Sequence, residues 1–148
     1  MINDEYFLAA LRLAAGSDPI PGHVSAAARD VFRLRVPSAI TAVPAECTAT
    51  RGVRGPEGPH MVRFVAAGLT FDLEVTFGDG LIDVAGQVCP TPGDGTLVDV
   101  RTPHLTLSRR LAPTGHFAVT GLPPGWLSVV CHRPGNAPVQ TRWVRIRP

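Results

Sequence analysis

The sequence predicts a mainly β protein: an antiparallel β-sandwich of about seven to nine short strands, preceded by an N-terminal two-helix hairpin. Three observations lead to this prediction. Apolar residues recur at helical spacing in the first 35 residues. From residue 60 onward they alternate with polar residues, which is the period of a β-strand. Gly and Pro, 15 of each among 148 residues, punctuate the chain as turns between many short strands would.

The length and composition indicate an ordered protein. We expect three segments: a helical hairpin over 1–36, a loop or linker over 37–60, and a β-sandwich domain over 61–148. A chain that is 45% hydrophobic and 18% charged is too apolar to be disordered. It has no apolar run long enough to span a membrane and no sign of a secretory signal, so a cytoplasmic protein without membrane contact is expected. The three cysteines, Cys47, Cys89 and Cys131, are widely spaced, which favours reduced side chains.

The first helix is expected to begin at Asn3 or Asp4 and to stop at Gly16. The second is expected to run from about His23 to Arg35. Each helix carries an apolar stripe, formed by Phe7, Leu8, Leu11 and Ala15 in the first and by Val24, Ala27, Ala28, Val31 and Leu34 in the second. Because helices this short are marginal alone, the stripes must be covered. Two interpretations stay open: the helices cover the β-sheet, or they form an arm that binds a partner.

The segment after the helices is expected to be mostly irregular. A short strand is predicted around Ile40–Val43 or Glu46–Thr50. The stretch Arg51–His60 is rich in Gly and Pro, so we expect a mobile loop that serves as a cleavage site or a hinge.

Strict alternation then predicts the central hairpin. Leu69–Phe77 has one apolar and one polar face, Gly78–Gly80 forms the turn, and Leu81–Val88 returns. The remaining strands are predicted at Leu97–Val100, Leu105–Ser108, His116–Thr120, Trp126–His132 and Val139–Ile146.

The stretch Gly115–Gly125 reads G-x-F-x-V-x-G-L-P-x-G. In this pattern the chain resembles the carboxypeptidase-regulatory-like domain, a transthyretin-like (immunoglobulin-like) β-sandwich, over Ile82–Ile146. The resemblance implies a non-catalytic packing or binding module.

The overall organisation also resembles that of small bacterial proteins encoded beside alternative sigma factors and caspase-like (CHAT) proteases in regulatory or defence cassettes. The resemblance lies in the N-terminal helices, the strand around Leu69–Phe77 and the closing residues Thr141–Ile146. It implies a role in transcription regulation or bacterial defence, with a sigma factor or a CHAT-type protease as the partner.

Charge is distributed unevenly along the chain. All 14 basic residues are Arg, which coding bias in a GC-rich genome also explains. Residues 64–100 hold six acids and no Arg, whereas residues 101–148 hold seven Arg and no acid. Two interpretations are open: acidic and basic strands pair across the sheet, or the domain has an oriented surface that docks a partner.

No motif predicts an enzyme, a cofactor or a metal site. The five His are scattered, and Cys131 and His132 are strand neighbours that point to opposite faces. Asp72 and Glu74 share a strand face roughly 7 Å apart. That spacing suits a glycosidase pair, but an ordinary solvent-exposed strand face looks the same. With no Lys and an acidic half, nucleic acid is not expected as a partner.

We therefore expect a non-enzymatic protein-interaction or regulatory module, and the alternative is a β-sandwich that binds a small ligand or a carbohydrate. Trp126, Trp143 and Arg145 are predicted on the outer face of the last strands, where either the helices or a partner covers them. The full set of candidate partner-binding residues is Phe7, Leu11, Val24, Arg29, Val31, Phe32, Arg33, Trp126, Trp143 and Arg145.

Overall fold

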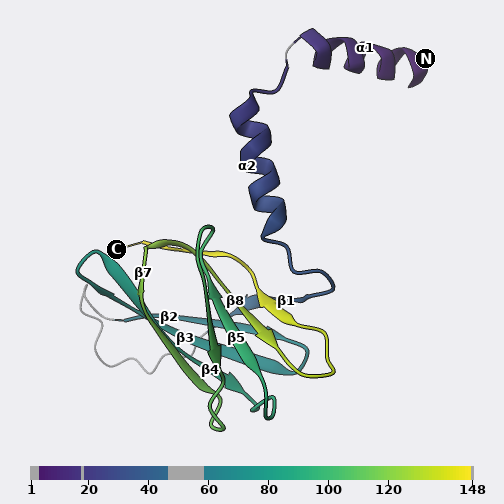
Figure 1. Ribbon diagram of the computed structural model, residues 1–148. Helices are drawn as coiled ribbons and strands as arrows, with labels where there is room; N and C mark the ends of the chain where they lie inside the picture. Colours follow the sequence, from purple (N-terminus) through teal and green to yellow (C-terminus); the bar gives the residue numbers. More distant parts are fainter. Residues whose placement is uncertain (1–3, 18, 47–58, 148) are drawn as a thin grey trace. The chain divides into compact units, whose positions relative to one another are not determined.

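The computed structural model describes residues 4–17, 19–46 and 59–147. Two compact units divide the chain, Met1–Arg35 and Val36–Pro148. The first unit contains two helices and the second contains the strands (Figure 1). The prediction of a mainly β protein with two N-terminal helices is thus confirmed. The cleavage or hinge site predicted at Arg51–His60 falls mostly outside the described residues.

Helix α1 spans Asp4–Ser17 and helix α2 spans Gly22–Arg33. Asp4 and Glu5 lie in the first turn of α1, where acidic side chains favour the positive end of the helix. The Ser17 hydroxyl donates to the Leu13 carbonyl at 2.9 Å, which carries the helix one residue past Gly16. Neither helix has a buried residue, so the structure does not show the expected hairpin core between them.

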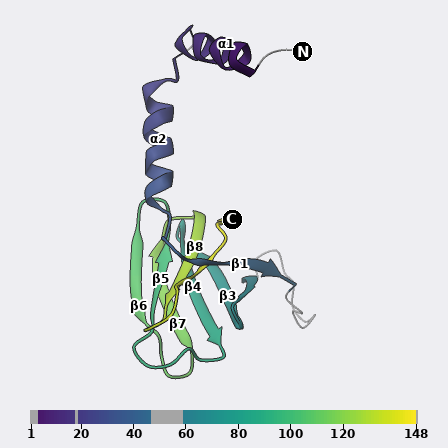
Figure 2. The same ribbon diagram turned by 90° about the vertical axis from the view of Figure 1, so that its right-hand side faces the viewer.

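The described part of the second unit contains ten strands, which exceeds the expected seven to nine. Their bounds are β1 Ile40–Ala45, β2 His60–Ala66, β3 Leu69–Gly78, β4 Leu81–Cys89, β5 Leu97–Arg101, β6 Thr106–Arg110, β7 His116–Leu122, β8 Gly125–His132, β9 Val139–Thr141 and β10 Val144–Ile146. The strands follow one path in the order β6-β5-β8-β9-β1-β2-β3-β4-β7, and β10 pairs with β8. The end strands β6 and β7 contact each other, which nearly closes the sheet into a barrel-like form (Figure 2).

Strand β1 confirms one of the two predicted strand positions, Ile40–Val43, and changes the picture of the sheet. Residues 40–45 pair parallel with β9 and antiparallel with β2. The sheet is therefore mixed rather than antiparallel throughout. Because β1 joins the two halves into one path, a sandwich of two separate sheets is not confirmed.

The predicted last strand, Val139–Ile146, is two strands in the structure. The Thr141 hydroxyl accepts a bond from the Val129 amide at 2.9 Å, and the Arg142 amide donates to the Ala42 carbonyl at 3.0 Å. The chain leaves β9 at this point, so Arg142 and Trp143 connect β9 with β10 rather than continuing a single ladder.

The core lies between the inward faces of the two halves of the sheet. Alternation is clearest in β3, where every second residue from Leu69 to Val75 is buried, as the sequence predicts. The largest fully buried side chains are Phe64, Phe71, Leu73, Ile82, Leu122, Leu127, Val75, Val84, Val88, Val98, Val100 and Val119.

One close approach in this core requires glycine. Gly86 on β4 lies opposite Phe117 on β7. A Cβ atom at Gly86 would lie 2.2 Å from Cζ of the Phe117 ring. The Phe117 ring thus fills the space that a side chain at position 86 would need.

Replacing Gly86 with Ala is expected to lower the free energy of unfolding by about 1–3 kcal/mol, because the added methyl group overpacks the core. The matched control is Gly78→Ala, since nothing lies within 4 Å of a Cβ at that position. Urea unfolding followed by circular dichroism measures both variants. Equal unfolding midpoints would contradict the packing of Phe117 against Gly86.

Candidate functional site

The structure places the predicted partner-binding residues on two surfaces. One is the exposed apolar faces of α1 and α2, and the other is the outer face of β5, β8 and β10. A third feature, a groove over β2, β3, β4 and β7, was not predicted as a site.

Every large apolar residue predicted to bind a partner through the helices is exposed. The exposed fractions are Phe7 55%, Leu11 50%, Val24 46%, Val31 66% and Phe32 66%. Helical spacing in the sequence places Phe7 and Leu11 on one side of α1, and Val24 and Val31 on one side of α2. Their role in binding a partner stays a prediction.

The basic residues of α2 make only local, exposed contacts. Arg33 pairs with Asp30 at 3.2 Å, with both side chains more than two-thirds exposed. Arg35 lies 5.1 Å from the centre of the Phe32 ring. Arg29 is exposed. Exposed pairs of this kind contribute little to stability, which leaves these cations available to a partner.

The outer face of β8 brings together two of the three remaining predicted residues. Arg145 on β10 lies directly opposite Trp126 on β8, and Trp126 is 48% exposed. Trp143 is half-buried, and its ring lies 5.3 Å from the Arg101 guanidinium carbon. Sequence analysis missed Arg101, although its alternation with Val98 and Val100 on β5 would have placed it on this face.

This outer face carries a small buried layer that was not expected. By alternation along β8, Val130 lies on the outer face with Ser128, and it does not belong to the main core cluster, yet it is fully buried. Ser128, on the same face of β8, is 1% exposed and donates from its hydroxyl to the Thr141 carbonyl at 3.1 Å. The outer face of β8 is therefore partly covered rather than fully open.

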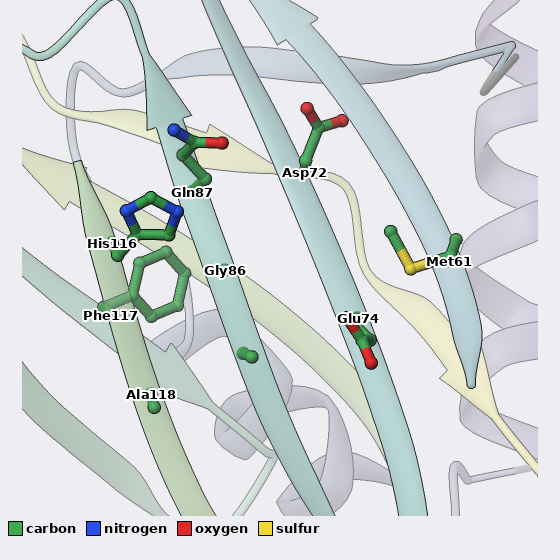
Figure 3. Close-up of a pocket in the computed structure, with 9 residues that line it drawn as sticks. Met61, Asp72, Glu74, Gly86, Gln87, His116, Phe117 and Ala118 are labelled. Atoms are coloured by element: carbon green, nitrogen blue, oxygen red, sulfur yellow. The ribbon is translucent and has the colours of Figure 1, made fainter. Parts of the chain in front are cut away.

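The groove lies on the outer face of the other half of the sheet. Its volume is about 530 Å³. Its lining residues are Met61, Asp72, Glu74, Ala85, Gly86, Gln87, His116, Phe117 and Ala118. Cross-strand pairing builds it in two rows, one of Asp72, Gln87 and His116, the other of Met61, Glu74, Ala85 and Ala118. One row is thus polar, and the other combines Glu74 with apolar side chains, with Gly86 and Phe117 between the two rows (Figure 3).

The carboxylate pair Asp72 and Glu74 does line this groove. Asp72, however, is held by Arg63, whose Nε and Nη2 donate to its two carboxylate oxygens at 2.5 and 3.0 Å. A bidentate partner of this kind holds a carboxylate in a fixed orientation. Arg63 thus engages both carboxylate oxygens of Asp72, as a cross-strand pair on an ordinary strand face does.

Cys131 and His132 lie on opposite faces, as alternation predicts. The Cys131 side chain is fully buried, and burial raises the pKa of its thiol to about 11. His132 Nε2 lies 2.7 Å from Asp99 Oδ2, and the Ser108 hydroxyl donates to Asp99 Oδ1. Asp99 is the central member of this cluster, so the Ser108 hydroxyl is not aligned with an imidazole base as nucleophilic catalysis requires.

The acidic and basic strands do not pair with each other as a rule. The acid-rich strands β3 and β4 pair with each other and with β2 and β7. Most arginines after residue 100 lie on β5, β6 and β10 or beside them. The Arg63–Asp72 pair is a cross-strand contact within the acidic half. This segregation favours an oriented surface over charge pairing within the sheet.

Three comparisons bear on the identity of the protein. The chain matches no family model, no curated protein and no solved structure. Among the described residues no group of His, Cys, Asp or Glu side chains is arranged to hold a metal ion. Neither α1 nor α2 is long and apolar enough to cross a membrane.

The raised pKa of Cys131 predicts how this thiol reacts. In a Cys47→Ser/Cys89→Ser protein, where Cys131 is the sole thiol, alkylation by iodoacetamide should stay slow until the pH approaches 11. The folded state also holds the thiol proton more tightly than the unfolded state, whose pKa is near 9.0. The stabilisation is therefore fully present below pH 9 and is lost as the pH rises through about 11. An alkylation rate that rises around pH 9, as for a free thiol, would contradict this burial.

Proposed function

We propose that this protein is a non-enzymatic protein-interaction module, in which α1 and α2 dock their apolar faces on a partner. The observation that carries the proposal is that neither helix has a buried residue although each has a continuous apolar stripe. Contiguous exposed apolar surface is typical of protein interaction sites.

The length of the helices supports this proposal. Helices of 14 and 12 residues are marginally stable in water unless they pack against something. Laying an amphipathic helix into an apolar groove is a common mode of protein recognition. The stripe of α2 holds Val24 and Val31, whereas Arg29 and Arg33 lie on the other side of the helix. The partner surface that fits the stripe of α2 is an apolar groove.

The resemblance in organisation extends the proposal to the partner. We propose a sigma factor or a CHAT-type protease of the same cassette, and a cytoplasmic role in transcription regulation or defence. Direct binding to each of these proteins, produced separately, would tell the two apart.

We further propose that the β unit is a variant of the carboxypeptidase-regulatory-like, transthyretin-like sandwich. The residues of the motif behave as that pattern requires. The side chains of Phe117 and Val119, both on β7, are buried in the core. Gly121 and Gly125 both have positive φ, at 74° and 136°. In this proposal β1 is the strand that joins the two layers.

The second candidate function is the binding of a small polar ligand or a carbohydrate in the groove. The specific observation in its favour is the set of convergent polar groups, Glu74, Gln87 and His116, that line this groove. Hydroxyl-rich ligands fit such a wall of donors and acceptors. A glycan array read with wild-type and Gln87→Ala proteins tests this function, and no binding above background would remove it.

The helix proposal predicts that Val31→Asp weakens the partner complex at least about tenfold, because a charge is placed on the docking stripe. The matched control, Ala26→Asp, adds the same charge on the other side of α2 and should bind within about twofold of wild type. Native pull-down with quantitative mass spectrometry identifies the partner, and titration calorimetry with the purified partner measures both variants.

The same two variants separate docking in trans from packing within the chain. If α2 binds a partner, Val31→Asp should melt at the wild-type temperature. A melting temperature lowered by Val31→Asp and unchanged by Ala26→Asp would mean that the stripe packs on the protein itself, and the proposal would fail. Equal partner binding by both variants would also contradict it.

A further inference from the structure

Arg101 is unusual among the basic residues of this chain. It is the last residue of β5 and points to the outer face, opposite Ser128 on β8 and Thr106 on β6. Only 8% of Arg101 is exposed. Its guanidinium group stacks on the Trp143 ring, with 5.3 Å from Cζ to the ring centre.

Two nitrogens of the buried guanidinium group have no acceptor among the residues that the structure describes. These are Nε and Nη2, which are both buried and make no hydrogen bond. The nearest acid in sequence is Asp99, but its two carboxylate oxygens are engaged by Ser108 and His132. Burial outweighs the attraction of Asp99 and lowers the pKa of Arg101 from its ordinary value. A buried cation without an acceptor costs stability that the stacking on Trp143 offsets only in part.

The surroundings of Arg101 favour an anion. The chain from residue 101 onward contains seven Arg and no acid. Trp126, two residues from Ser128 on the same face of β8, faces the exposed Arg145. Thr106, directly across from Arg101 on β6, is exposed and can donate from its hydroxyl. The face thus offers a planar donor, a hydroxyl donor and two indole rings.

We propose that Arg101 and Trp143 form a receptor for a carboxylate side chain on an acidic segment of the partner protein. The carboxylate would accept hydrogen bonds from the guanidinium nitrogens that have no acceptor, while Trp143, which is half-exposed, moves aside or flanks it. A planar guanidinium fork matches a carboxylate in bidentate geometry. That the ligand is a protein rests on the proposed function. The receptor itself lies entirely in the β unit.

A protein ligand fits this face better than a nucleic acid. A polyphosphate chain needs a continuous basic groove, and the other half of the same sheet carries Asp72, Glu74, Asp79 and Asp83. Two Trp beside Arg also have the composition of protein-interface hot spots.

The test uses the full-length chain and a fluorescein-labelled oligoglutamate peptide, with fluorescence anisotropy as the readout at fixed salt. We expect saturable binding that Arg101→Leu weakens about tenfold, as for the loss of a charged hydrogen-bonding partner. The matched control is Arg109→Leu on β6, which removes the same charge from an exposed side chain bonded to its own neighbour's carbonyl. This control should change the dissociation constant by less than about twofold.

Thermal melting of the same variants keeps the test interpretable. Arg101→Leu should melt at or above the wild-type temperature, because an apolar side chain replaces a buried charge that lacks an acceptor. A lower melting temperature with unchanged peptide affinity would show that Arg101 is structural, and the proposal would be overturned.

Three further outcomes would overturn the proposal: no binding of oligoglutamate, equal weakening by both variants, or tighter binding of a single-stranded oligonucleotide than of the peptide. None of these results depends on α2. The two proposals can fail separately. If Arg101→Leu weakens peptide binding but Val31→Asp does not weaken the partner complex, the inference about Arg101 stands and the proposed function fails. If Val31→Asp weakens the partner complex but Arg101→Leu does not weaken peptide binding, the proposed function stands and this inference fails.

Discussion

The rest of the β unit depends on the double pairing of β1. The first half of this strand pairs parallel with β9 and its second half pairs antiparallel with β2. Two backbone bonds fasten the parallel side, from the Ile40 amide to the Pro138 carbonyl at 2.8 Å and from the Arg142 amide to the Ala42 carbonyl at 3.0 Å. Ala42, between them, is fully buried. Through this one strand the two halves of the sheet become a continuous path around a single core.

That connection also gives the domain two outer faces of different chemistry. The half made of β2, β3, β4 and β7 presents carboxylates, a glutamine and a histidine around a groove, and its Arg63–Asp72 pair is internally neutral. The half that contains β5, β8 and β10 presents arginines and both tryptophans. Since the acids and most of the arginines are not neighbours in the sheet, they do not neutralise each other by pairing. A domain with charge distributed in this way is oriented before it meets a partner, which favours specific association.

Patterns among neighbouring residues predicted the elements whose contacts are local in the sequence. The hairpin of β3 and β4 was expected at Leu69–Phe77 and Leu81–Val88, and it extends by only one residue at the end of each strand. Alternation with a Gly-Asp-Gly turn is sufficient for such a hairpin. A strand at Ile40–Val43 was one of two predicted alternatives, but its pairing was not predicted, because its burial pattern does not alternate and its parallel partner lies about 100 residues away along the chain. The burial of Arg101 could not be predicted for the same reason. It depends on Trp143, which lies far away along the chain, and no local pattern brings those two residues together.

Hydrogen–deuterium exchange of the free, full-length protein, resolved by peptide, tests most directly whether the helices await a partner. Amides in α1 and α2 should exchange close to the rate of an unstructured chain, because helices this short are marginally stable until a partner covers them. Amides in β1 and β3 should be protected nearly to the limit of global unfolding. Protection of α2 equal to that of β3 would show that its apolar stripe is already packed in the free protein, and would contradict the account of the helices as a docking element.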